Sequence, residues 1–166
     1  MNEENIVELP EESPDLAAAY PELAHLKAAN EALRERGQHW LFSTFEKISQ
    51  PNPDLQIGQQ DWQFEVDRNV MIGVRMGIRF RDQTLTIEVG WPREQSHGIV
   101  PDLGLARARV SHSPNVTIDA NLLDILTLRK EKDSDEVNWY KLKNNQVGEK
   151  ITEEVLQEYL AKLTAT

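Results

Sequence analysis

The chain has 166 residues, of which 39% are hydrophobic and 28% are charged, and it contains no cysteine. These values exclude fibrous, low-complexity and wholly disordered proteins, and also disulfide frameworks, thiolate zinc sites and cysteine nucleophiles. No apolar run approaches the ~18 residues of a membrane span, and the first residues are acidic, unlike those of a secretory signal. We therefore expect a cytoplasmic globular protein without a membrane partner.

The formal net charge is −10, and most of the acidic excess lies in residues 1–60. A field of this sign repels polyanions, which argues against nucleic acid as a partner. Two explanations of the acidic excess remain open at this level. It can keep the protein soluble, or it can steer the protein toward a basic partner protein.

The beginning of the chain predicts a flexible acidic arm over residues 1–12, followed by a single α+β domain over residues 13–166. Ser13, followed by proline, is typical of a helix start. Pro21 interrupts this helix because an interior proline removes a hydrogen bond and clashes with the preceding turn. The main N-terminal helix is therefore expected over residues 21–36.

Gly37 is expected just beyond the C-terminal end of this helix. Residues 38–49 fit a strand or a second helix, and helical spacing of their apolar side chains favours the helix. Apolar residues of the N-terminal segment also recur at intervals of seven, with Asn30 at one such position. This pattern is compatible with a helix-mediated dimer and with a helix that packs on its own domain.

Three segments between residues 61 and 91 alternate apolar and polar side chains, as half-buried strands do. The short connections at 67–69 and 81–83 predict an antiparallel meander. The apolar set is expected to face the core, and it includes Trp62, Phe64, Ile87 and Trp91.

Residues 103–112 alternate again, and their small side chains are expected to face inward. Residues 120–130 fit a helix or a strand, and the turn-like residues 132–135 favour a hairpin with 137–143. Thr152 is suited to cap a C-terminal helix with one apolar stripe. This order predicts an α+β fold, with N-terminal helices, an antiparallel sheet of about four to six strands, and the C-terminal helix packed on one sheet face.

The sheet face opposite the apolar one is expected to be rich in arginine and glycine. It carries Arg75, Arg79, Arg107, Arg109, Gly73 and Gly77. Arginine forks bind carboxylate or phosphate bidentately, and glycine inside a strand often marks a close approach by another group. This face is therefore a candidate site for an anionic ligand. The alternative is a solvated face whose arginines pair across strands with Glu65 and Glu88.

Candidate residues for acid–base catalysis are Glu88 on this face, with His97 and Asp102 in the loop after the third strand. Trp40 and Trp139 are candidate exposed anchors for a partner, because tryptophan is enriched at interaction hot spots. The histidines have no metal-ligand spacing, and the phosphate-binding loops and nucleophile motifs of common enzymes are absent from the sequence. We therefore expect no metal and no cofactor.

These features favour a non-catalytic protein–protein interaction module: a small acidic adaptor, or a chaperone-like or regulatory protein, that forms a homodimer. The alternative is an enzyme or sensor that binds a small anionic ligand on the arginine- and glycine-rich face. The sequence identifies neither the partner nor the ligand, and it leaves open whether the protein catalyses a reaction.

Overall fold

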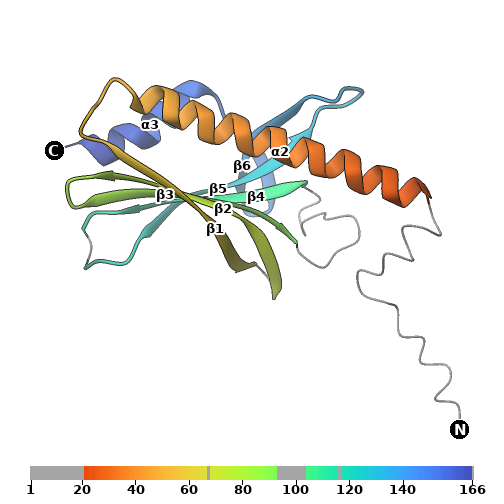
Figure 1. Ribbon diagram of the computed structural model, residues 1–166, viewed down its shortest axis with the longest axis horizontal. Coiled ribbons are helices and arrows are strands. Elements are labelled where there is room, and N and C mark those ends of the chain that lie inside the picture. Colours follow the sequence, from red (N-terminus) through yellow and green to blue (C-terminus); the bar gives the residue numbers. More distant parts are fainter. Residues whose placement is uncertain (1–20, 67, 93–103, 116, 166) are drawn as a thin grey trace, which may run out of the picture.

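A computed structural model describes residues 21–66, 68–92, 104–115 and 117–165. Helix α2 (Pro21–Ser49) precedes seven strands, and helix α3 (Glu153–Thr164) follows them (Figure 1). The strands are β1 (Gln56–Val66), β2 (Asn69–Phe80), β3 (Gln83–Pro92), β4 (Ala106–Ser113), β5 (Asn121–Lys130), β6 (Val137–Lys143) and β7 (Gln146–Lys150). The predicted arm 1–12 and the helix start at Ser13 lie outside the described residues.

The strands form one antiparallel sheet whose spatial order is the order of the chain. The predicted α+β class and antiparallel meander are confirmed, as is the hairpin of β5 and β6, but the sheet has seven strands rather than four to six. The additional strand is β7, whose residues are all exposed and therefore lack a hydrophobic pattern. Its one sequence signal is the turn at Asn144 and Asn145, where both φ angles are positive, as hairpin turns require.

Helix α2 is one continuous helix of 29 residues, so the predicted break at Gly37 is wrong. Gly37 is buried where the helix crosses the sheet, and a Cβ atom there would lie 2.6 Å from the Leu128 methyl carbons. Its carbonyl also accepts a hydrogen bond of 2.9 Å from Trp139 Nε1. Glycine at this position therefore permits close helix–sheet packing and does not end the helix.

Trp139 is 1% exposed and belongs to the core, so the prediction of an exposed anchor at this position is wrong. Its indole packs beneath α2, and the hydrogen bond to Gly37 satisfies the only polar atom of the ring. Trp40, in contrast, is 39% exposed on α2. The interaction role of Trp40 stays a prediction.

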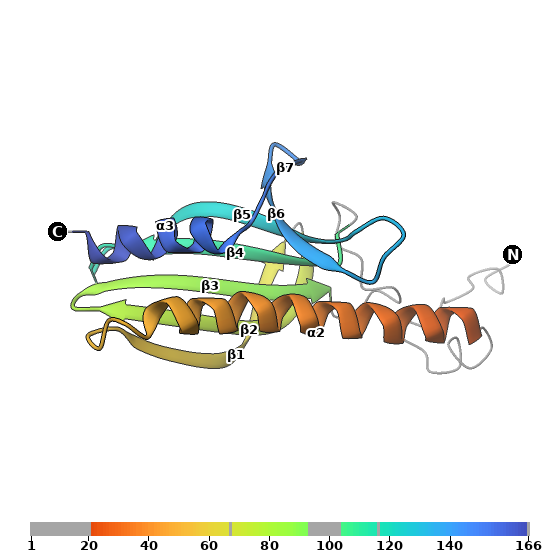
Figure 2. The same ribbon diagram turned by 90° about the horizontal axis from the view of Figure 1, so that it is seen from above.

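Both helices cover the same face of the sheet, as Figure 1 and Figure 2 show. The core between them includes Ile87, which is fully buried as predicted, and the small side chains of β4. Helix α3 is capped by Thr152 as predicted, and its apolar stripe belongs to this core. Tyr159 also donates a hydrogen bond of 2.6 Å to Asp124 on β5, and burial together with this carboxylate raises the pKa of the tyrosine. Neither helix has an apolar stretch long enough to cross a membrane.

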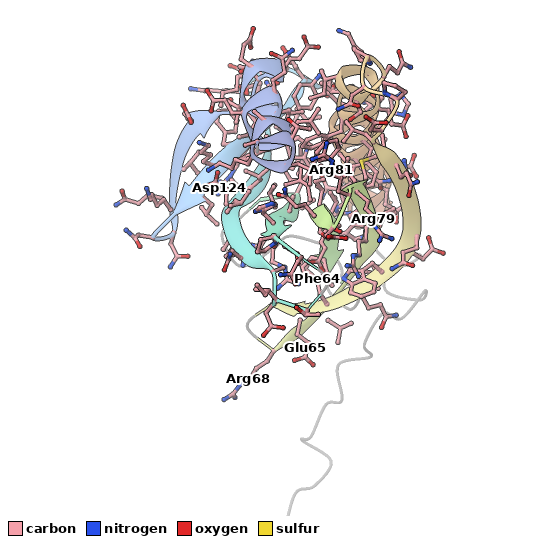
Figure 3. The ribbon with its side chains drawn as sticks, turned by 90° about the vertical axis from the view of Figure 1, so that its left-hand side faces the viewer. Phe64, Glu65, Arg68, Arg79, Arg81 and Asp124 are labelled. Atoms are coloured by element: carbon pink, nitrogen blue, oxygen red, sulfur yellow. The ribbon has the colours of Figure 1, made fainter. Side chains whose placement is uncertain are left out.

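Trp62 and Phe64 face away from the helices, so their predicted place on the core face is wrong. In the register of the sheet they pair with Gly73 and Met71, which lie on the arginine-bearing face. The β1–β2 hairpin bends away from α2 and passes beneath β3 and β4 (Figures 1 and 3). Phe64 and Met71 thereby form a second, smaller apolar cluster with Trp62.

This bend depends on a pair of glycines. Gly73 lies directly opposite Gly90 in the β2–β3 register. A Cβ atom at Gly73 would lie 1.7 Å from the Val89 carbonyl oxygen, and one at Gly90 would lie 2.9 Å from Cε1 of Phe64. Only residues without a side chain fit this approach.

We expect Gly73→Ala to lower the free energy of unfolding by about 1–3 kcal/mol, because its methyl group would overlap the backbone of β3. Gly77→Ala is the matched control, since a Cβ atom there meets nothing within 4 Å on the same strand and face. It should change stability by less than about 1 kcal/mol. Urea unfolding of both variants measures the difference, and equal effects would contradict the close approach at Gly73.

Candidate functional site

The register places Arg75, Arg79, Arg107 and Arg109 on one face of the sheet, together with Gly73 and Gly77. Their exposure differs along this face. Arg79 is exposed, Arg75 and Arg109 are half-buried, and Arg107 is buried. The predicted ligand-binding set therefore shares one face but does not form one open surface.

Glu88 lies between two of these arginines, opposite Arg75 on β2 and Arg109 on β4. Its Oε2 atom accepts hydrogen bonds from Trp62 Nε1 and from a terminal nitrogen of Arg109, the latter at 3.1 Å. The Glu88 side chain is only 12% exposed. Glu88 therefore has a hydrogen-bond partner on each side. Its pairing with Arg109 is of the kind expected under the alternative interpretation, in which the arginines of this face pair with glutamates across strands.

Aromatic rings complete this network. The Arg75 guanidinium lies 4.5 Å from the centre of the Trp62 ring, and that of Arg109 lies 4.5 Å from the centre of Phe64. Cations over aromatic faces are attracted by the ring quadrupole. Glu88 on β3 and Arg109 on β4 therefore hold the β1–β2 hairpin against these two strands, while the contact of Arg75 with Trp62 joins β2 to β1 within the hairpin.

A shallow trough of about 310 Å³ lies beside this network on the same face. Gly58 and Gly77 pair directly across β1 and β2, and a Cβ atom at either would meet nothing within 4 Å. Gln60 and Arg75 also line the trough. Of the residues predicted to form a bare floor on β2, the trough includes Gly77 and Arg75 but not Gly73 or Arg79. Gly58 was missed because it precedes the expected start of β1.

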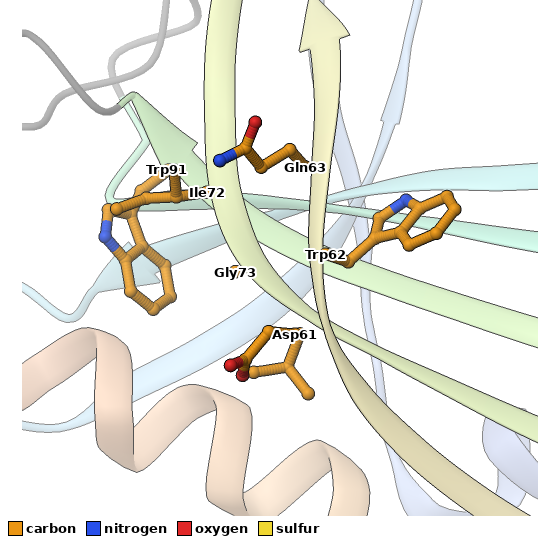
Figure 4. Close-up of a pocket in the computed structure, with 7 residues that line it drawn as sticks. Asp61, Trp62, Gln63, Ile72, Gly73 and Trp91 are labelled. Carbon is orange, nitrogen blue, oxygen red and sulfur yellow. The ribbon is translucent and has the colours of Figure 1, made fainter.

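A larger groove lies on the other face, between α2 and β1. One hollow of about 690 Å³ lies over β1, β2 and β3, where Asp61, Ile72 and Trp91 line it (Figure 4). A second hollow of about 660 Å³ follows α2, where Phe42 and Gln59 line it. Gln59 lines the second hollow, and Asp61 and Gln63 line the first. Because alternate residues of a strand point to the same face, the two hollows follow one another along this face of β1, and we refer to them together as the α2–β1 groove.

This groove combines an apolar floor with an acidic rim. Phe42, Ile72, Val74 and Trp91 provide the apolar floor. The exposed carboxylates of Glu35, Glu46 and Asp61 stand at the rim, where Arg36 is the one lysine or arginine among the described lining residues. Sequence reasoning missed this site because the groove arises where β1 and α2 lie apart. The alternation of apolar and polar residues along a strand does not reveal the distance between that strand and a helix.

Arg34 of α2 is buried and contacts Trp91, one of the residues that line the groove. Its Nε donates a hydrogen bond of 2.7 Å to the Leu105 carbonyl, and its guanidinium lies 5.9 Å from the centre of the Trp91 ring. Burial lowers the pKa of Arg34, and the nearby carboxylate of Glu31 opposes this shift. Arg34 therefore links α2 to the residue that directly precedes β4.

The candidate catalytic residues are not brought together in the described part of the chain. Glu88 is held in the network above, while His97 and Asp102 lie outside the described residues. Across residues 21–66, 68–92, 104–115 and 117–165, no group of three or more histidine, aspartate or glutamate side chains is placed to hold a metal ion.

Comparison with protein-family models, with curated proteins and with solved structures found no match to this chain.

Proposed function

We propose that this protein is a non-catalytic interaction module, an adaptor or chaperone-like protein that holds an extended segment of a partner protein in the α2–β1 groove. The observation that carries the proposal is the combination of an apolar floor and an acidic rim in the two hollows that follow β1. The segment it suits alternates apolar and basic side chains. The acidic net charge of the chain supports the same kind of partner.

The length of the groove suits a short extended peptide. The lining residues of α2 run from Ala32 to Glu46, which corresponds to about 21 Å of helix. An extended chain advances about 3.4 Å per residue, so about six residues span this length. In such a segment every second side chain could reach Phe42 or Trp91, and those between them could reach the rim.

Electrostatics favours lysine or arginine at the rim positions. Glu35 and Asp61 are exposed, so attraction to a basic peptide steers association and weakens as salt concentration rises. Glu46 is also exposed and accepts a hydrogen bond of 2.7 Å from Gln59, which fixes its position beside β1. The apolar floor would supply most of the affinity, because apolar burial is the main favourable contribution to association.

Selection from a random displayed peptide library tests this proposal. We expect the peptides retained by the wild-type protein to alternate apolar residues with lysine or arginine. Their affinity, measured by fluorescence anisotropy, should fall at least tenfold for the double variant Glu35→Lys, Asp61→Lys. Both side chains are exposed, so the variant should fold normally.

The matched control is the double variant Asp82→Lys, Asp119→Lys, which changes the net charge equally at exposed residues outside the groove lining. It should alter affinity less than twofold at physiological salt. The proposal fails if no peptide is enriched, if the enriched peptides lack basic residues, or if both double variants lose affinity equally.

A second candidate function rests on the trough at Gly58 and Gly77. Its floor of bare backbone lies beside Arg75 on β2. Arg79 lies on the same face, two residues beyond Gly77 on that strand. Arginine forks bind phosphate or carboxylate bidentately, so this trough supports the alternative of a sensor or enzyme for a small anionic ligand. The contact of Arg75 with Trp62 would orient the fork without neutralising its charge.

If the trough binds anions, phosphate should raise the melting temperature by about 2–4 °C for each kcal/mol of binding free energy. The double variant Arg75→Lys, Arg79→Lys should lose this effect, because lysine keeps the charge but lacks the fork. Potassium chloride at equal ionic strength is the control. A melting temperature that phosphate leaves unchanged would remove the anion-binding candidate.

A further inference from the structure

The two edges of the sheet are protected very differently. Strand β7 has five residues, includes Lys150, and pairs with β6 through a register shift, all of which discourage further pairing. Strand β1 has eleven residues and pairs with β2 in unbroken register. Long, regular edge strands present a row of backbone donors and acceptors that another strand can bind.

The first half of β1 is the part available for such pairing. Residues 56–61 are all exposed, and Figure 2 shows that this part of β1 bows outward beyond α2. No described strand pairs with its outer side. Residues 56–60 contain no charge and no proline, so they lack the side chains that commonly block edge pairing.

We propose that a second copy of this chain binds here, so that Gln56–Gln60 of the two copies pair antiparallel about a twofold axis at Gly58. In this register Gln56 lies opposite Gln60 of the partner copy, and Ile57 lies opposite its Gln59. No two charges face each other, whereas full-length pairing centred on Asp61 would place two carboxylates directly opposite, which is destabilising.

The chosen register also explains two surface features of β1. Ile57 is 38% exposed in the single chain, and the paired strand would cover it. Gly58 carries no side chain, so its two copies can lie directly opposite each other at the axis without a side-chain clash. Direct pairs on one face of antiparallel strands lie about 4.5–5.5 Å apart, which brings the two Gly58 positions into contact range.

The sequence contains no cysteine, so any disulfide cross-link in a single-cysteine variant must join the introduced residues of two copies. Gly58→Cys should form a covalent dimer on mild oxidation, because the residue meets its own copy at the axis. Gln56→Cys and Gln60→Cys should each remain monomeric on denaturing gels, since their partner copies lie about 14 Å away along the strand. A mixture of the Gln56→Cys and Gln60→Cys proteins should cross-link, because these two positions face each other.

Sedimentation equilibrium tests the non-covalent dimer independently. The wild-type protein should be a dimer, and Gly58→Lys should be a monomer because two lysines would meet at the axis. Val147→Lys, on the exposed strand β7, should stay dimeric. The proposal is overturned if the wild type is monomeric at all concentrations, if Gly58→Lys stays dimeric, or if the Gln56→Cys protein cross-links with itself. The peptide affinity of monomeric Gly58→Lys tests the two proposals separately. If this variant still binds the selected peptides, the groove functions without the dimer, and a failure of one proposal does not imply a failure of the other.

Discussion

The close approach of β2 and β3 at Gly73 and Gly90 determines how the rest of the molecule is arranged. Because neither residue has a side chain, the two strands and the Phe64 ring come nearer to one another than any other residue would permit. The β1–β2 hairpin can therefore bend beneath β3 and β4, away from α2. This one bend creates both the network on the arginine face and the groove on the helix face.

The two faces serve different purposes. On the arginine face, Glu88 joins Trp62 to Arg109, so the charges there are largely engaged in holding the hairpin in place. On the helix face, the same bend carries Asp61 away from α2 and leaves Trp91 at the bottom of the groove. The proposed partner site thus depends on a bend whose stability comes from the opposite side of the sheet.

Much of the fold could be predicted because β2, β3 and β4 alternate regularly and their connections are short. The exact face of Trp62 and Phe64 could not, because a second apolar cluster on the far side produces the same alternation as the main core. Gly37 resembles a helix end in sequence, and only its contact with Leu128 reveals a crossing point. Trp139 illustrates the same limit, since its burial depends on α2, about one hundred residues away in sequence. The groove was missed for this reason as well, because its walls come from elements that only the folded chain brings together.

The orientation of β1 can be measured directly in solution by nuclear Overhauser spectroscopy on the isotope-labelled protein. The bend at Gly73 and Gly90 predicts strong cross-peaks between the Phe64 ring protons and the Hα protons of Gly90. Cross-peaks from the Phe64 ring to the side chain of Ile72, on the helix-facing side of β2, would instead contradict the bend and the groove that depends on it.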